Sequence, residues 1–252
     1  MNSRTARVTA LPVPADLAHL VAASWVLAGG AVPRGLPHPA VDLLVMPDGE
    51  CRLAGPETRV RQGTLPGGGA LVGLRLRPGT VTGLFGVAAD EVPLAGAPLD
   101  AGRLDGPVAE RPAGALALVR ARAGRCQVDE RVRAVVAAMH ASPGTPVHRH
   151  AARAGLSERQ LRRRFGVAVG LRPKAYVRVV RLHHALAAAR AAMARGERPD
   201  WAAIAVRSGC YDQSHLLAEF RHAVGAPPAT LLPDVRFLQA PPGRGQHTRR
   251  HE

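Results

Sequence analysis

Three arginines, Arg159, Arg162 and Arg163, are spaced so that they would lie on one face of a short helix. A helix turns by about 100° per residue, which places Leu161 and Phe165 together on the opposite face. These two apolar residues would anchor the helix to a core and leave the arginines outside. Arginine can donate two hydrogen bonds to O6 and N7 of guanine in the major groove of DNA. The expected chemistry is recognition of base edges.

The residues before these arginines predict the start of a helix-turn-helix unit. Thr145 can cap a first helix that has Pro146 at its first position. Gly155 can adopt the positive φ of a tight turn. Ser157, followed three residues later by Gln160, forms the sequence pattern of a capping box that starts the arginine-bearing helix.

A second unit repeats this order of features 55 residues further along the chain. Asp200 and Asp212 are placed to cap its two helices. Leu216 and Phe220 occupy the positions of the two apolar anchors in the first unit. One amphipathic pair of helices separated by glycine is common, whereas two copies with matching anchors favour a duplicated DNA-binding unit.

A long helix is predicted between the two units, over residues 174–194 after Pro173. Its 21 residues would span about 32 Å, close to the ~34 Å between successive major-groove segments on one side of B-DNA. Lys174, Arg178 and Arg181 recur at i, i+4 and i+7 along it. They form either a stripe that contacts phosphate or a solvated face.

Residues 128–232 resemble the DNA-binding domain of the AraC/XylS family of transcription regulators. The resemblance is carried by AARAGLSERQLRRRF, GLRPKAYVRVVRLHHA and IAVRSGCYDQSHLLAEFRHAVGAPPATL, in that order. It implies a seven-helix domain with two helix-turn-helix units joined by a long helix. The N-terminal stretches MPDG, LAGPETR and LVGLRLRPG resemble the sensor-like domain of one AraC-type subgroup.

The sequence departs from this family at three positions. Cys210 stands where an aromatic core residue is usual, and His150 stands where an aliphatic one is usual. Ala218 occupies an outward position that is often polar or basic, which weakens base reading by the second recognition helix.

The predicted DNA contacts fall into three groups. The first recognition helix contributes Ser157, Arg159, Gln160, Arg162 and Arg163. The second contributes Gln213, Ser214, His215, Leu217 and Ala218. Candidates for contacts with phosphate are Arg164, Lys174, Arg178, Arg181 and Arg221. Arg164 lies at the flank of its helix, where it meets either phosphate or an acidic neighbour.

Charge and periodicity predict two domains. Residues 129–252 carry 21 basic and 9 acidic side chains, whereas residues 1–128 carry 13 and 10. The first half reads as short strands over 24–27, 41–46, 51–54 and 71–77, separated by glycine and proline. We therefore expect a β-rich (α+β) sensor or dimerisation domain over residues 1–124. An all-α DNA-binding domain over 125–238 and a disordered basic tail over 239–252 would follow it.

The remaining features exclude several classes of protein. Cys51, Cys126 and Cys210 lack the paired spacing of a zinc site or a disulfide framework, and the histidine spacings suit no metal. We expect no cofactor and no metal. No apolar run reaches the roughly 18 residues that span a bilayer. A cytoplasmic protein without a membrane partner is expected.

Two other functions are compatible with the sequence. One is a non-specific architectural DNA binder, favoured by the formal net charge of +15. The other is an enzyme, such as a DNA-repair protein that carries this module, although residues 1–125 lack a cysteine cluster or paired catalytic carboxylates. The favoured interpretation is a non-enzymatic, sequence-specific transcription regulator. Its expected partner is double-stranded DNA, and RNA polymerase, a small-molecule effector and a second copy of the chain are further candidates.

Overall fold

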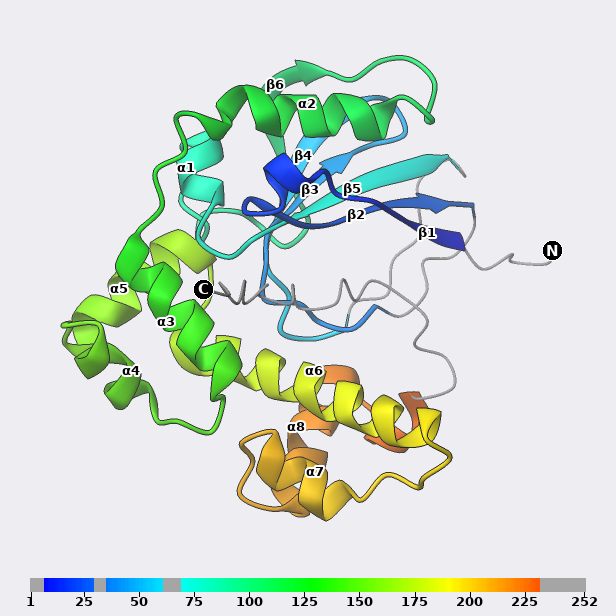
Figure 1. Cartoon of the computed structure of the whole chain (residues 1–252). Coiled ribbons are helices and arrows are strands. Elements are labelled where there is room, and N and C mark those ends of the chain that lie inside the picture. Colours follow the sequence, from blue (N-terminus) through cyan, green and yellow to red (C-terminus); the bar gives the residue numbers. More distant parts are fainter. Residues whose placement is uncertain (1–6, 30–34, 61–68, 232–252) are drawn as a thin grey trace, which may run out of the picture.

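A computed structural model describes residues 7–29, 35–60 and 69–231. It divides into a β-sheet part and a helical part, which Figure 1 shows one above the other. This is the two-domain architecture expected from the sequence, with a β-rich N-terminal part and an all-α C-terminal part. The expected disordered tail, residues 239–252, lies outside the described residues, as do residues 232–238 at the end of the expected DNA-binding domain.

The N-terminal part is built on one antiparallel sheet in the order β1-β2-β5-β3-β4-β6. Its strands are β1 (Arg7–Leu11), β2 (Val21–Ala28), β3 (Asp42–Val45), β4 (Glu50–Ala54), β5 (Ala70–Leu76) and β6 (Ala97–Arg103). The four strands expected from alternating hydrophobicity are β2 to β5, which form the centre of the sheet. Strands β1 and β6 were not expected. They are edge strands with mostly exposed or half-buried side chains, so they lack a strong apolar alternation.

One face of the sheet is covered by the 3₁₀ turn η1 (Ala15–Leu17) and the helices α1 (Val81–Phe85) and α2 (Arg111–Ala123). Leu43 and Val45 of β3 are completely buried in this core, together with Ala115 and Val119 of α2. Helix α2 was not expected. Its inward residues are small or β-branched, and its apolar face is weakly marked in the sequence.

The opposite face of the sheet holds a smaller apolar cluster around Trp25, Leu27 and Leu71. Gly73 pairs with Trp25 across the β2–β5 ladder. A Cβ built on Gly73 would lie 2.1 Å from Cζ2 of the Trp25 indole. The absence of a side chain at Gly73 therefore makes the space in which the indole packs.

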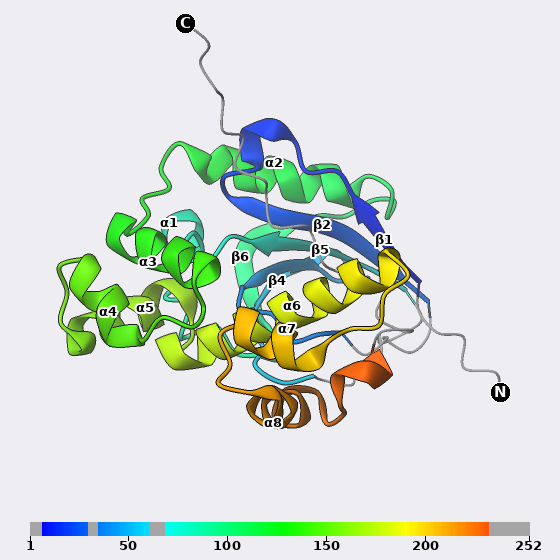
Figure 2. The ribbon, with the colours of Figure 1, turned by 60° about the horizontal axis from the view of Figure 1, so that its bottom comes forward.

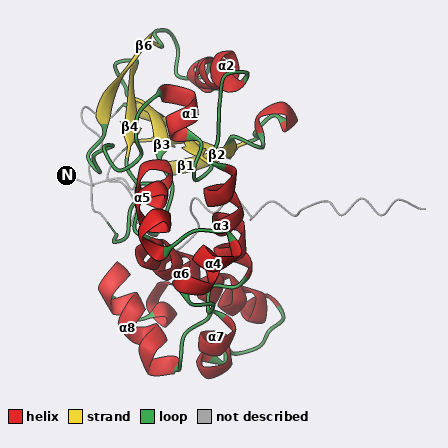
Figure 3. Ribbon diagram, turned by 90° about the vertical axis from the view of Figure 1, so that its left-hand side faces the viewer, coloured by secondary structure: helices red, strands yellow, loops and turns green. Residues whose placement is uncertain are grey.

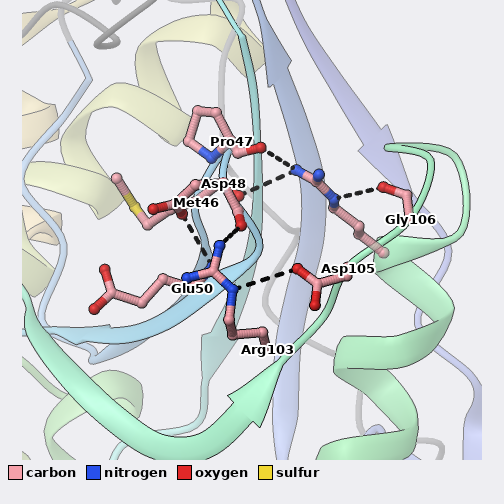
Figure 4. Close-up of polar contacts among 8 residues, drawn as sticks. Met46, Pro47, Asp48, Glu50, Arg103, Asp105 and Gly106 are labelled. Carbon is pink, nitrogen blue, oxygen red and sulfur yellow. Dashed lines mark hydrogen bonds and ion pairs between the residues drawn. The ribbon is translucent and has the colours of Figure 1, made fainter.

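The turn between β3 and β4 is fixed by two arginines, one from the neighbouring strand β6 and one from α2. Arg103 donates hydrogen bonds to the Asp48 backbone oxygen and to Asp105. Arg111, at the start of α2, donates to the backbone oxygens of Met46 and Pro47 at 3.1 and 2.9 Å. Figure 4 shows this network around the turn. These contacts attach the MPDG stretch to β6 and α2.

The helical part contains two small cores with one helix in common. Its elements are α3 (Glu130–Ala141), α4 (Val147–Arg153), α5 (Glu158–Val169), α6 (Pro173–Ala194), α7 (Trp201–Arg207), α8 (Gln213–Val224) and the 3₁₀ turn η3 (Pro228–Leu231). Tyr176 and Val180 of α6 pack into the core of α3–α5. Leu182 and Leu186 of the same helix pack into the core of α7 and α8. Helix α6 therefore joins the two units by burial at both of its ends.

Two details of the expected helices are corrected by the structure. Helix α4 begins at Val147 with Pro146 at its N-cap, so Thr145 does not cap it. The sequence predicts an apolar stripe along the long helix, formed by Tyr176, Val179, Val180, Leu186 and Met193, but Met193 is 49% exposed. It lies in the last turn of α6, after the helix has passed the core of the second unit.

Replacing Gly73 with alanine is expected to destabilise the N-terminal part. The added methyl group overlaps the buried indole of Trp25, and overpacking of this kind costs about 1–3 kcal/mol. The measurement is the free energy of unfolding of the full chain in urea. Gly124→Ala is the control, because a Cβ there meets nothing within 4 Å and the φ of −66° suits alanine. Equal stability of the two variants would contradict the packing argument.

Candidate nucleic-acid interface

The first helix-turn-helix unit is formed by α4 and α5, and its turn and the start of α5 are those that the sequence predicts. Gly155 has a φ of +65°. Ser157 Oγ accepts a hydrogen bond from the Gln160 backbone N–H at 3.2 Å, and Gln160 Oε1 accepts from the Ser157 N–H at 2.9 Å. This capping box fixes where α5 starts, and therefore which residues each face of the helix carries.

The inner face of α5 is fully buried. Leu161 and Phe165 are 0% exposed, and the Phe165 ring lies edge-on to Tyr176 of α6, with 5.3 Å between the ring centroids. Arg159, Arg162 and Arg163 are all exposed on the outer face. Arg162 has one weak contact, 4.0 Å from the Glu158 carboxylate one turn earlier. The structure thus brings the three predicted base-reading arginines together on one open face.

These arginines border a hollow that reaches the N-terminal part of the chain. Arg159, Arg162 and Arg163 line it together with Gly166, Gly170, Leu171 and Arg172 from the helical part, and with Asp90 from the loop after α1. Four guanidinium groups around one depression create a region of positive potential that attracts anions. Arg172, the N-cap residue of α6, and Asp90 were not among the residues predicted from the sequence, and only the fold places Asp90 beside α5.

Arg164 lies at the flank of α5, where its guanidinium pairs with Asp129. The distance from Arg164 Nη1 to Asp129 Oδ2 is 2.8 Å. Asp129 also caps α3 by accepting hydrogen bonds from the backbone N–H groups of Arg131 and Val132. Burial raises the pKa of Asp129, but the Arg164 hydrogen bond and the two N–H groups outweigh it, and the net shift is downward. Arg164 therefore has an acidic neighbour, which was one of the two alternatives for this residue.

The second unit, α7 and α8, repeats the design of the first. Asp212 Oδ1 accepts from the His215 N–H at 2.7 Å, and Leu216 and Phe220 are buried. Among the predicted base contacts of α8, three residues are exposed and two are half-buried. The exposed ones are Gln213, Ser214 and Ala218, and the half-buried ones are His215 and Leu217.

Tyr211, just before α8, was not predicted as a contact. It is 89% exposed, at the end of the unit from which the recognition helix starts. Its place one residue before the cap of the recognition helix makes Tyr211 a further candidate for a contact with phosphate, which Tyr side chains also bind.

A polar cluster around Glu219 connects α6 with α8. Glu219 Oε1 lies 3.5 Å from Arg181 Nη1 and 3.2 Å from His215 Nε2. Arg181 also donates to the Pro143 backbone oxygen at 3.1 Å, and His215 Nδ1 accepts from the Tyr211 N–H. Arg181 and His215 are thus held by contacts within the protein. The predicted contacts of Arg181 with phosphate and of His215 with a base stay predictions. Each would require the residue to exchange its bonds within the protein for bonds to DNA.

The other phosphate candidates, Lys174, Arg178 and Arg221, have exposed side chains. Lys174 and Arg178 lie on α6, and Arg221 lies in the last turn of α8.

All three cysteine thiols have a raised pKa, mainly because they are buried. Burial, with the Glu219 carboxylate as the next cause, raises the pKa of Cys210 to about 12. Burial also raises the pKa of Cys51 and of Cys126. The departures from the family at Cys210 and His150 are both accommodated as buried side chains. Within residues 7–29, 35–60 and 69–231, no group of three or more His, Cys, Asp or Glu residues is arranged to hold a metal ion.

The N-terminal part contacts both recognition helices near their C-terminal ends. In the first unit, Thr82 Oγ1 and the Ala89 N–H both donate to the Val167 oxygen of α5, at 3.1 and 2.7 Å. In the second, the Val60 N–H donates to the Ala223 oxygen of α8 at 2.7 Å. The last carbonyls of a helix have no partner within the helix, so these contacts satisfy groups that would otherwise bind water.

A third contact joins the N-terminal part to α6. Figures 1 and 2 show α6 on the side of the sheet opposite α2. In that region His183 Nε2 donates to the Pro37 oxygen at 2.7 Å, and Leu36 packs into the core of the second unit. Burial lowers the pKa of His183 to about 4, so its ring is neutral at neutral pH. Figure 3 shows the helical part in red below the strands in yellow.

Two family models match the chain. A model described as "Helix-turn-helix domain" matches residues 150–233, and one described as "Domain of unknown function (DUF6597)" matches residues 9–93. No curated protein matches the sequence.

Several solved structures of ToxT from Vibrio cholerae are similar to the chain. One is 8% identical with a TM-score of 0.46, and the match covers 85% of this chain and 97% of that one. Another is ToxT with a bound unsaturated fatty acid, which is 8% identical with a TM-score of 0.39. That match covers 83% of this chain and 93% of the ToxT chain. No helix among the described residues is long and apolar enough to cross a membrane.

Glu219→Gln is expected to destabilise the helical part. The side chain of Arg181 is only 19% exposed, and the substitution leaves this cation without its counter-ion. We expect a loss of about 1–3 kcal/mol, the cost of an unsatisfied buried group. The measurement is thermal unfolding of the full chain. Glu197→Gln is the matched control, because its ion pair with Arg195 is more than half exposed and should contribute little. A loss of stability of the same size in both variants would show that the Arg181–Glu219 ion pair stabilises the protein no more than an exposed one does.

Proposed function

We propose that the chain is a transcription regulator of the AraC/XylS type that reads a specific DNA sequence, and the helix-turn-helix model that matches residues 150–233 supports this. Its two recognition helices, α5 and α8, would enter successive major-groove segments on one side of the duplex. The observation that carries this proposal is the outer face of α5. There, Arg159, Arg162 and Arg163 are exposed on a helix whose start and inner face are fixed.

The long helix α6 supports the use of both units at once. Its 22 residues correspond to about 33 Å, close to the ~34 Å repeat of the major groove. The candidate phosphate contacts would fix the register on DNA, and base edges would supply specificity. These candidates are Arg164, Lys174, Arg178, Arg181 and Arg221.

The N-terminal part is proposed to sense a signal or to dimerise. Its backbone contacts with α5 and α8 support this role, because a change in the N-terminal part reaches both recognition helices directly. The proposed partners are a small-molecule effector, RNA polymerase and a second copy of the chain. We also propose that the protein is cytoplasmic and has no enzymatic activity. We place the domain boundary between residues 124 and 125, after the end of α2 at Ala123.

Selection of bound duplexes from a random DNA pool tests the proposal. The full chain should enrich one sequence, and it should prefer that sequence over unrelated DNA by roughly a thousandfold or more at physiological salt. Equal binding to all duplexes would support a non-specific architectural binder instead.

Arg163→Ala is expected to weaken specific binding and leave the fold intact, because the side chain is exposed and contributes nothing to the core. Loss of one bidentate base contact costs about 1–3 kcal/mol. The measurement is the Kd for the selected duplex, with circular dichroism as the check on folding. Arg7→Ala removes the same charge from an exposed position in strand β1 and serves as the control. If Arg163→Ala binds as tightly as the wild type, the proposed role of Arg163 is wrong.

The two halves of the DNA site are expected to differ in their tolerance of base changes. The outer face of α5 carries three strong donors, whereas Leu217 and Ala218 of α8 can only contact a thymine methyl group. The half bound by α5 should be read mainly through guanine, and the half bound by α8 should tolerate change. Binding to every single-base variant of the selected site measures this. Equal sensitivity in both halves would assign a larger share of the reading to Gln213 and His215.

A further inference from the structure

The loop of residues 88–91 belongs to the N-terminal part but lies against the recognition helix α5. Ala89, which is 1% exposed, donates its N–H to the Val167 oxygen at 2.7 Å. Two glycines allow this approach. A Cβ built on Gly170, which has a φ of +80°, would lie 2.6 Å from the Ala89 oxygen, and one built on Gly166 would lie 3.1 Å from Asp90 Oδ2. The loop is therefore seated on surfaces that lack side chains.

This seating brings an acidic side chain to the edge of the proposed DNA-contact face. Asp90 is exposed and lines the same hollow as Arg159, Arg162 and Arg163. Gly166 follows Arg162 and Arg163 at i+4 and i+3, so it continues the arginine face by one turn. The Asp90 carboxylate occupies the end of that face.

A carboxylate in this position acts on DNA binding through charge. It offsets part of the positive potential of the three arginines, and it repels the phosphates of a duplex that approaches them. The Debye length is about 8 Å at physiological ionic strength, so the effect is local and is reduced by salt.

The contact at the second recognition helix has the opposite charge. There the N-terminal part presents Arg59, whose Nη2 donates to His222 Nε2 of α8 at 3.1 Å. An anionic counter-charge is thus present at the first unit, and a cation lies near the C-terminal end of the recognition helix in the second. The N-terminal part therefore places side chains of opposite charge next to the two recognition helices.

We propose that Asp90 is a regulatory residue of the DNA-binding face. While the loop of residues 88–91 is docked on Gly166 and Gly170, its carboxylate weakens the binding of DNA by α5. Movement of the loop away from α5 removes the carboxylate and strengthens that binding. This inference rests on the part of the proposed function that places α5 against DNA, and it adds a device by which the state of the N-terminal part sets the affinity of the first unit.

The test compares Asp90→Asn with Glu91→Gln in the full chain. Each variant loses one negative charge from an exposed position in the same loop, but Glu91 is not among the residues that line the hollow. The measurement is the Kd for the selected duplex over a series of salt concentrations. We expect Asp90→Asn to tighten binding by about threefold or more at low salt, with a gain that shrinks as salt rises, and Glu91→Gln to have a smaller effect.

A double variant locates the effect on α5. If Asp90 acts through the arginine face, the gain from Asp90→Asn should be reduced in an Arg163→Ala background, because the two side chains then show coupling. Equal gains in Asp90→Asn and Glu91→Gln, no gain in Asp90→Asn, or a gain that is unaffected by Arg163→Ala would each overturn the proposal.

Failure of sequence specificity would give a different result. In that case the wild-type chain would bind selected and unrelated duplexes equally. Asp90→Asn would still tighten binding to both, which would support the role of Asp90 and reject the specific regulator.

Discussion

The burial of one aromatic side chain in each recognition helix is the interaction on which the rest of the DNA-binding face depends. Phe165 of α5 and Phe220 of α8 are both completely buried, in a chain in which aromatic residues make up only 3%. A helix held at one such anchor cannot rotate without exposing a large apolar surface. The anchor therefore decides which side chains face solvent. In α5 these are three arginines, and in α8 they are mostly small or uncharged residues.

Helix α6 transmits this constraint from one unit to the other. Tyr176 near its start belongs to the core with Phe165, and Leu186 in its second half belongs to the core with Phe220. The Arg181–Glu219 ion pair adds a polar contact between these two apolar regions. The spacing of the two recognition helices is consequently a property of packing along a continuous helix. It does not depend on a flexible linker.

The N-terminal part completes the arrangement by binding the carbonyl ends of both recognition helices. These carbonyls need partners in any folded state, and Ala89 and Val60 provide them from separate loops of the sheet domain. The same docking carries a carboxylate to α5 and a guanidinium to α8. Sensing and DNA binding would therefore be coupled through direct contacts, because the residues that could respond to a signal lie next to the helices that would read DNA.

The sequence by itself determined the local features of this protein. The capping box of Ser157 and Gln160, the caps at Asp129, Asp200 and Asp212, and the central strands of the sheet all depend on neighbours within a few residues, so their patterns are visible in the chain. The exposed arginines of α5 follow from helical periodicity alone. The edge strands β1 and β6 and helix α2 were not predicted, because their own sequences carry no strong apolar periodicity.

Only the tertiary structure decided what surrounds the predicted contacts. Arg181 and His215 fit the pattern of DNA-contacting residues, but the fold places both beside Glu219. Asp90 carries no signal in the sequence, and it becomes part of the candidate interface because Gly166 and Gly170 let a loop of the other domain approach α5. Which charged groups interact depends on their distance in space, and the pattern of residues along the sequence does not give that distance.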